Sequence, residues 1–208
     1  MKKISRCLLT LAPALVLAAS ISALGQPPAE PSLQLPPTGK AAVLRSPDKQ
    51  WALIAKPFPQ HTVLLQKRAT HKNALVLKYE RAGKVGWSPD SRAFYFDDQA
   101  GSNVEDAYVY WIGASAPLEL NSAILSSDKE AAAVQADHAY FHAQRWIDAG
   151  NLEVEYCGHG GSNPVVQFGF VYTVTLQGPG KPAATVMRTS ALTRPSTSLD
   201  CDLTAADR

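Results

Sequence analysis

Two stretches of the chain carry the same turn-and-strand pattern. The sequence SPDKQWALI begins at Ser46, and SPDSRAFYF begins 42 residues later at Ser88. In each copy the proline fixes a backbone φ angle suited to a turn, and the aspartate is placed to accept hydrogen bonds from amides inside that turn. A strand of apolar and aromatic residues follows at once. The repeat predicts that two similar β units are built one after the other.

The second copy resembles a known repeat signature. Trp87-Ser88-Pro89-Asp90-Ser91, followed by an aromatic strand, is similar to the WSPDG motif of the TolB-type, PD40 (WD40-like) family of β-propeller repeats. The resemblance covers residues 43–113. Two departures concern the motif's glycine, which is replaced by Ser91 in one copy and by Gln50 in the other. The first copy also lacks the leading tryptophan, and later copies of the motif are degraded.

The resemblance implies a fold of blade-like sheets. A spacing of about 42 residues suits one four-stranded blade, but a full propeller of six or more blades needs a longer chain. The family pattern therefore predicts an open or incomplete array of propeller-like blades. A four-bladed ring and a sandwich that uses the same turns are the alternatives.

The remaining pattern also indicates an all-β, mainly antiparallel fold. Short β-rich runs are expected to pair as 61–68 with 74–80, 92–97 with 107–113, and 152–157 with 165–176. In the last run, residues 168, 170, 172, 174 and 176 are apolar or aromatic, as expected for a strand with one buried face. One short helix is predicted near 121–137, where an alanine run follows polar residues suited to an N-cap.

The N-terminal region predicts export. Residues 1–25 contain Lys2, Lys3 and Arg6, then an apolar run and a small-residue end, which is the order of a cleaved signal peptide. The chain is therefore expected to be periplasmic or secreted, without stable membrane insertion after cleavage. The next segment, 26–39, carries five prolines and is predicted to be a linker. Residues 40–190 are expected to form a single β domain, and 191–208 a polar C-terminal tail.

Charge and cysteine content narrow the class further. The chain has 20 basic and 18 acidic residues, and loss of the three basic residues in 1–25 leaves 17 and 18. A formal charge of −1 offers no basic footprint for nucleic acid. The two cysteines outside the leader, Cys157 and Cys201, are predicted to form a disulfide, and closing this 44-residue loop stabilises the fold by about 4 kcal/mol in the chain-entropy model.

Polar and aromatic residues around 97–106 are the first candidate site. We expect a binding surface made by Asp97, Asp98, Asn103, Glu105, Asp106 and Trp111, with Tyr108 and Tyr110 nearby. Exposed aromatic side chains beside polar loops are typical of interfaces. Calcium binding is an alternative because carboxylates are hard oxygen ligands. A solvated hairpin connection, with the tyrosines packed between sheets, is the plain interpretation.

Three histidines are the second candidate site. His138, His142 and His159, with a reduced Cys157, have the ligand types of a zinc site. The competing interpretation is that alternation places His138, Tyr140, His142 and Trp146 on one partly buried face. The glycine-rich stretch 157–164 contains His-Gly-Gly, as some esterases do, but no Gly-x-Ser-x-Gly motif accompanies it. A connection between strands is the simpler interpretation.

The sequence therefore favours an exported, non-enzymatic binding or scaffold protein. Its partner is expected to be another envelope protein or a glycan, and no cofactor is predicted unless the calcium or zinc alternative holds. A small extracytoplasmic metal-dependent hydrolase that uses His138, His142 and His159 is the alternative function. The oligomeric state stays open, including pairing of exposed sheet edges with a second copy.

Overall fold

The computed structural model describes residues 31–134, 136–160, 166–178 and 183–195. The described chain is mostly β, with mainly antiparallel sheets, as the sequence predicts, and it also has two short helices. Within these ranges, no helix is long and apolar enough to span a membrane. The predicted signal peptide lies outside the described residues.

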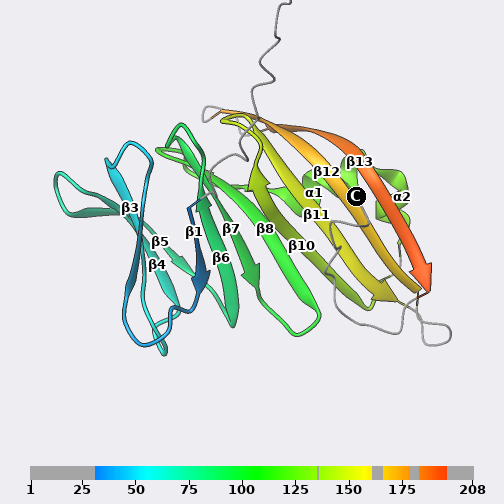
Figure 1. Cartoon of the computed structure of the whole chain (residues 1–208), viewed down its shortest axis with the longest axis horizontal. Coiled ribbons are helices and arrows are strands. Elements are labelled where there is room, and N and C mark those ends of the chain that lie inside the picture. The colour runs from blue at the N-terminus through cyan, green and yellow to red at the C-terminus, as the bar shows by residue number, and fades with distance from the viewer. Residues whose placement is uncertain (1–30, 135, 161–165, 179–182, 196–208) are drawn as a thin grey trace, which may run out of the picture.

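Two sheets stand side by side (Figure 1). The smaller sheet has the order β2-β3-β4-β5, formed by Ala42–Arg45, Trp51–Ala55, Thr62–Lys67 and Lys72–Lys78. The larger sheet has the order β1-β6-β7-β8-β10-β11-β12-β13, and β9 pairs with β8. Its strands are Ser32–Leu35, Ala82–Trp87, Ala93–Gln99, Val104–Trp111, His138–Trp146, Asn151–Gly160, Val166–Gln177 and Ala183–Pro195, and β9 is Leu118–Glu119.

The repeated motif makes two equivalent turns. Each connects the first strand of an antiparallel run to the second: β2 to β3, and β6 to β7. The Ser46 hydroxyl donates to Asp48 at 2.6 Å and accepts from the Trp51 amide at 3.0 Å. The Ser88 hydroxyl makes the same bonds to Asp90 and the Ala93 amide, at 2.8 and 3.0 Å.

The glycine position of the motif is Lys49, not Gln50 as expected. Lys49 and Ser91 occupy matching places in the two turns and have φ values of 61° and 65°, the left-handed region that glycine adopts most easily. In place of a glycine, Ser91 supplies a contact between the turns, because its hydroxyl accepts a hydrogen bond from the Asp48 amide at 2.9 Å.

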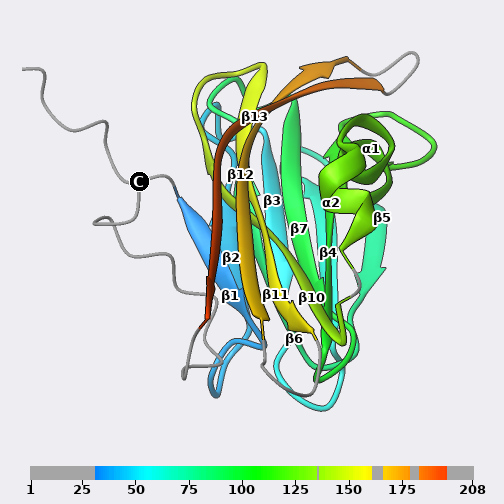
Figure 2. The ribbon, with the colours of Figure 1, turned by 90° about the vertical axis from the view of Figure 1, so that its right-hand side faces the viewer.

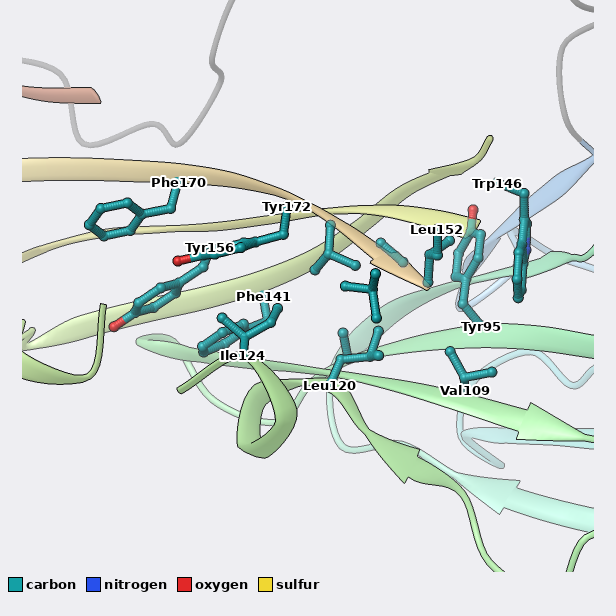
Figure 3. Close-up of a cluster of buried hydrophobic side chains, with 14 of the residues drawn as sticks. Tyr95, Val109, Leu120, Ile124, Phe141, Trp146, Leu152, Tyr156, Phe170 and Tyr172 are labelled. Atoms are coloured by element: carbon teal, nitrogen blue, oxygen red, sulfur yellow. The ribbon is translucent and has the colours of Figure 1, made fainter. Parts of the chain in front are cut away.

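Two apolar clusters meet at β7, whose residues 93–97 are all buried. Phe94 and Phe96 contact the smaller sheet, whereas Ala93 and Tyr95 belong to the cluster formed with β10, β11, β12 and the helices. Figure 3 shows part of this second cluster, with Phe141, Tyr156 and Phe170 lying along one face. A continuous apolar run is what a strand buried on both faces requires.

The predicted hairpins form as expected. β4 pairs with β5, β7 with β8, and β11 with β12, all antiparallel. Phe168, Phe170, Tyr172 and Val174 are buried on one face of β12. The stretch predicted as a glycine-rich connection begins as strand, since β11 continues to Gly160. A β-carbon at Gly158 would clash with the His138 carbonyl of the neighbouring strand, so close strand approach explains that glycine.

The predicted linker and tail boundaries are wrong in part. Ser32–Leu35 form β1 at the edge of the larger sheet, paired with β6, because the prolines flank these four residues and leave their amides free to bond. At the other end, β13 continues to Pro195, five residues into the predicted tail, because it pairs along β12.

Two helices form where one was predicted. α1 spans Leu120–Ser127 and α2 spans Lys129–Ala133, and both cover one face of the larger sheet (Figure 2). Asp128 separates them with an extended backbone and caps α2 by accepting hydrogen bonds from the amides of Glu130 and Ala131. An N-cap residue has non-helical angles, so a cap in the middle of the run divides it into two helices.

Candidate functional site

The larger sheet forks between β8 and β10. These strands are parallel neighbours at only two positions, Val104 with Ala139 and Glu105 with Tyr140. Farther along, β8 pairs with β9 instead, and β10 passes close to β6 and β7. Backbone hydrogen bonds between the strands are replaced there by a side-chain contact. The Asp97 carboxyl group accepts a hydrogen bond from the Ala143 amide at 3.0 Å.

A polar pocket of about 240 Å³ opens at this fork. Six strands of the larger sheet supply its wall, and β1 contributes a single residue. The lining residues are Gln34, Ala82, Gly83, Lys84, Asp97, Gln99, Glu105, His142, Ala143, Gln144 and Glu155. The pocket therefore collects three carboxylates, one imidazole, one ammonium group and three side-chain amides that lie far apart in the sequence.

Asp97 is the most strongly perturbed group in the pocket. Its side chain is 1% exposed, and burial raises its pKa to about 8, although the Ala143 amide favours the charged form. The carboxyl group is therefore mainly protonated at neutral pH. Lys84, directly opposite on β6, donates to the carbonyls of Ala143 and Gln144 at 3.3 and 3.4 Å.

His142 and Glu105 form a hydrogen-bonded pair beside Asp97. The His142 Nδ1 lies 3.1 Å from the Glu105 Oε1. Burial lowers the pKa of His142, but the hydrogen bond and charge of Glu105, with a smaller contribution from Glu155, raise it overall above its usual 6.5. Glu155 is 3% exposed and accepts a hydrogen bond from the Gln144 amide at 2.7 Å.

A β-bulge determines which side chains reach the pocket. Between Ala143 and Arg145 the register of β10 against β11 shifts by one residue. The sequence alternation that placed Trp146 on the histidine face is broken at this point, and Trp146 belongs to the apolar cluster instead, donating to the Gly86 carbonyl at 3.3 Å. The prediction for Trp146 is therefore wrong.

The predicted acidic surface is divided between several environments. β7 continues to Gln99 and β8 begins at Val104, so most of the expected loop is strand. Asp97 and Glu105 line the pocket. Asp98 and Asp106 face each other across β7 and β8, and burial raises the pKa of both. The expectation of an exposed Asp97 is wrong, because strand alternation turns it into the fork.

The other predicted binding residues lie outside the pocket. Asn103 donates to the Asp137 carbonyl at 3.4 Å, and Asp106 accepts from Asn121. Trp111 was expected to be exposed, but it is 8% exposed and belongs to the larger apolar cluster. Tyr108 and Tyr110 are half-buried against the other cluster, with Tyr110 stacked on Phe94, which agrees with the interpretation that they pack between sheets.

The three histidines do not meet at one point. The rings of His138 and His159 stack with centroids 4.2 Å apart, while His142 bonds to Glu105. Burial, followed by the charge of His138, lowers the pKa of His159. Among the residues that the structure describes, no group of three or more His, Cys, Asp or Glu side chains is arranged to hold a metal ion.

Cys157 is buried in β11. Its predicted partner, Cys201, lies outside the described residues, so the disulfide stays a prediction.

Several pocket residues were not predicted from the sequence. Lys84, Gln144 and Glu155 belong to ordinary-looking strands, and no local pattern distinguishes them from exposed polar residues. They become neighbours only because the fork brings β6, β10 and β11 together.

Comparison of the chain with protein-family models, with curated proteins and with solved structures found no match. The resemblance of the repeat to the TolB-type family therefore stays a prediction.

Proposed function

We propose that the chain is an exported, non-enzymatic binding protein that recognises a glycan through the polar pocket. The observation that carries this proposal is the charge balance of the pocket wall. Glu105 is paired with His142, Glu155 with the Gln144 amide, and Lys84 with two backbone carbonyls. With Asp97 protonated, the wall has many donors and acceptors but little net charge, which suits a neutral, hydroxyl-rich ligand.

The size and surroundings of the pocket support the same ligand class. A volume of about 240 Å³ corresponds to roughly eight water molecules at about 30 Å³ each, which is room for one sugar unit. Tyr140 and His142 lie side by side with nearly parallel rings, 15° apart. Such rings offer an apolar surface beside the polar wall for the carbon face of a sugar.

In this proposal the repeated units are the scaffold that holds the pocket. The matching hydrogen bonds of the two turns, together with the antiparallel orders β2-β3-β4-β5 and β6-β7-β8-β9, support two propeller-like blades in an open array. β7 and β8 of the second unit supply Asp97 and Glu105. Asp97 and Glu105 would then lie on a repeat unit that packs against the other repeat unit.

Hydrolysis at the same pocket is the second candidate function. The raised pKa of Asp97 beside Glu105 and His142 favours it, because separated pKa values are typical of acid and base pairs. Of the three histidines predicted for a hydrolase, this candidate retains only His142, and it adds Asp97 and Glu105.

A glycan array followed by titration calorimetry tests the proposal. We expect the exported, purified protein to retain one class of oligosaccharide. Glu155→Gln should weaken that binding about tenfold, since the charged hydrogen bonds of a buried carboxylate are lost while its shape is kept. Glu153→Gln is the matched control, because Glu153 is on the same strand and pairs with Arg145 outside the pocket.

Three results would decide against glycan binding here. They are an array without a retained glycan, equal weakening by the two glutamine variants, or unchanged binding in both. Release of shorter sugars from a retained glycan, abolished by Asp97→Asn, would instead establish the hydrolase.

A further inference from the structure

A second groove, of about 570 Å³, runs beside β5 at the edge of the smaller sheet. Its lining includes five consecutive residues, 74–78. Successive side chains of a strand point to opposite faces, so an unbroken run of lining residues means that the groove borders the backbone edge. Tyr110, Trp111 and the segment 113–117 make the opposite wall.

The hydrogen bonding of β5 identifies the backbone groups that face this groove. The Tyr79 amide donates to the His61 carbonyl at 3.2 Å, so Tyr79 bonds toward β4. Bonding direction alternates along an antiparallel strand, and the register holds without a shift from Lys78 to Leu75. The N–H and C=O groups of Val76 and Lys78 therefore face away from β4. No other described strand pairs with that edge.

The charges around β5 indicate what would pair with it. Lys78 is the one charged residue in the lining. The hairpin that leads into β5 reads KRATHK over residues 67–72, with three lysine or arginine residues, one histidine and no acid. At the strand itself, the Val76 side chain is 53% exposed. An extended segment with alternating apolar residues, and with acids at the end beside Lys72, complements this edge.

We propose that the free edge of β5 binds an extended acidic segment of a partner protein as a fifth strand of the smaller sheet. Backbone groups of Val76 and Lys78 supply the hydrogen bonds, and the basic hairpin sets the orientation. This site is separate from the polar pocket and does not depend on glycan binding.

Fluorescence anisotropy with synthetic peptides tests the proposal. The probe is a fluorescein-labelled DDVTVTV peptide, and its comparators are KKVTVTV and the acidic peptide with N-methylated valines. Val76→Pro removes a groove-facing N–H and leaves the β4–β5 ladder intact. Val43→Pro is the matched control, because Val43 lies on the opposite edge strand, β2, with a similar exposure of 55%.

We expect saturable binding of the acidic probe, about tenfold weaker for Val76→Pro and unchanged for Val43→Pro. The N-methylated peptide should bind about tenfold more weakly, and Lys72→Glu should reduce the preference for DDVTVTV over KKVTVTV. Hydrogen exchange at the Val76 and Lys78 amides should slow in the complex.

Absence of saturable binding, or equal affinity of the methylated and unmethylated peptides, would overturn the proposal. If Val76→Pro does not fold, the N-methylated peptide and Lys72→Glu still decide.

Discussion

Asp97 shows how a single residue can serve both the fold and the pocket. Its carboxyl group occupies the place where β10 leaves the ladder, and it accepts the Ala143 amide that would otherwise lack a strand partner. The same burial keeps the group mainly protonated at neutral pH. The structural role of Asp97 and its proposed role in binding therefore depend on one protonation state.

The raised pKa of Asp97 predicts a pH dependence of stability. The unfolded chain releases this proton near pH 4, whereas the folded chain holds it to about pH 8. The free energy of unfolding should therefore fall by about 1.4 kcal/mol per pH unit between these values through this group. Asp97→Asn, which stays neutral, should remove that contribution.

Urea denaturation at pH 5, 6, 7 and 8 measures the difference between the wild type and Asp97→Asn. As the pH rises, the wild type should lose stability relative to Asp97→Asn. Comparing the two proteins at each pH cancels the titration of the other groups. Parallel stability curves would show that Asp97 is ionised in the folded protein.

The left-handed residue of the first turn gives a second prediction at this scale. Lys49→Gly should stabilise the fold by about 0.5 kcal/mol, because relief of a left-handed backbone worth about 1–2 kcal/mol exceeds the added chain entropy of glycine. Gln50→Gly should destabilise it by about 0.5–1 kcal/mol. Thermal unfolding of the pair measures both changes, and the opposite order would place the turn's glycine position at Gln50.

At the scale of elements, Asp128 joins the helices to the sheet. It caps α2, accepts a hydrogen bond from the Tyr172 hydroxyl at 3.2 Å, and lies 3.3 Å from the Arg188 guanidinium. These contacts connect α2 to β12 and β13. The helices are short, so they depend on such tertiary contacts.

Asp128→Ala should lower the free energy of unfolding by about 2 kcal/mol, from loss of the cap and of the partner of Tyr172. Chemical denaturation measures the change. Glu130→Ala is the control, because its ion pair with Arg188 is exposed and is worth less than about 1 kcal/mol. A loss for Glu130→Ala as large as that for Asp128→Ala would refute the capping role.

At the scale of the whole molecule, β7 unites the two sheets. One face of β7 packs on the smaller sheet and the other on β10, β11 and the helices. The fork and its pocket lie next to this shared strand. The proposed β5 groove lies on the smaller sheet, so the two proposed binding surfaces are connected through β7, where the two apolar clusters meet.

The predicted disulfide also concerns the whole molecule, because it would link Cys201 covalently to Cys157 in the buried strand β11. Cys201→Ser should lower the free energy of unfolding by about 4 kcal/mol under oxidising conditions. Under reducing conditions the variant and the wild type should be equally stable. Peptide mapping without reductant should find Cys157 linked to Cys201, and two free thiols per denatured, unreduced chain would contradict the pairing.

Local chemistry explains what the sequence could predict. The two turns follow from Pro47, Pro89 and the serine and aspartate beside each, because their hydrogen bonds close within a few residues. The buried face of β12 follows from strict alternation. The division of α1 from α2 was missed because the capping role of Asp128 competes with an alanine run that favours one helix.

The amino-acid sequence by itself determined the β class, the repeated turns and the main hairpins, since these depend on contacts between near neighbours in the chain. Only the tertiary structure decided that β8 exchanges β10 for β9, that a bulge turns Trp146 into the core, and that Asp97 meets His142. These outcomes depend on strands that are distant in sequence, and a local pattern carries no information about which neighbour a strand will find.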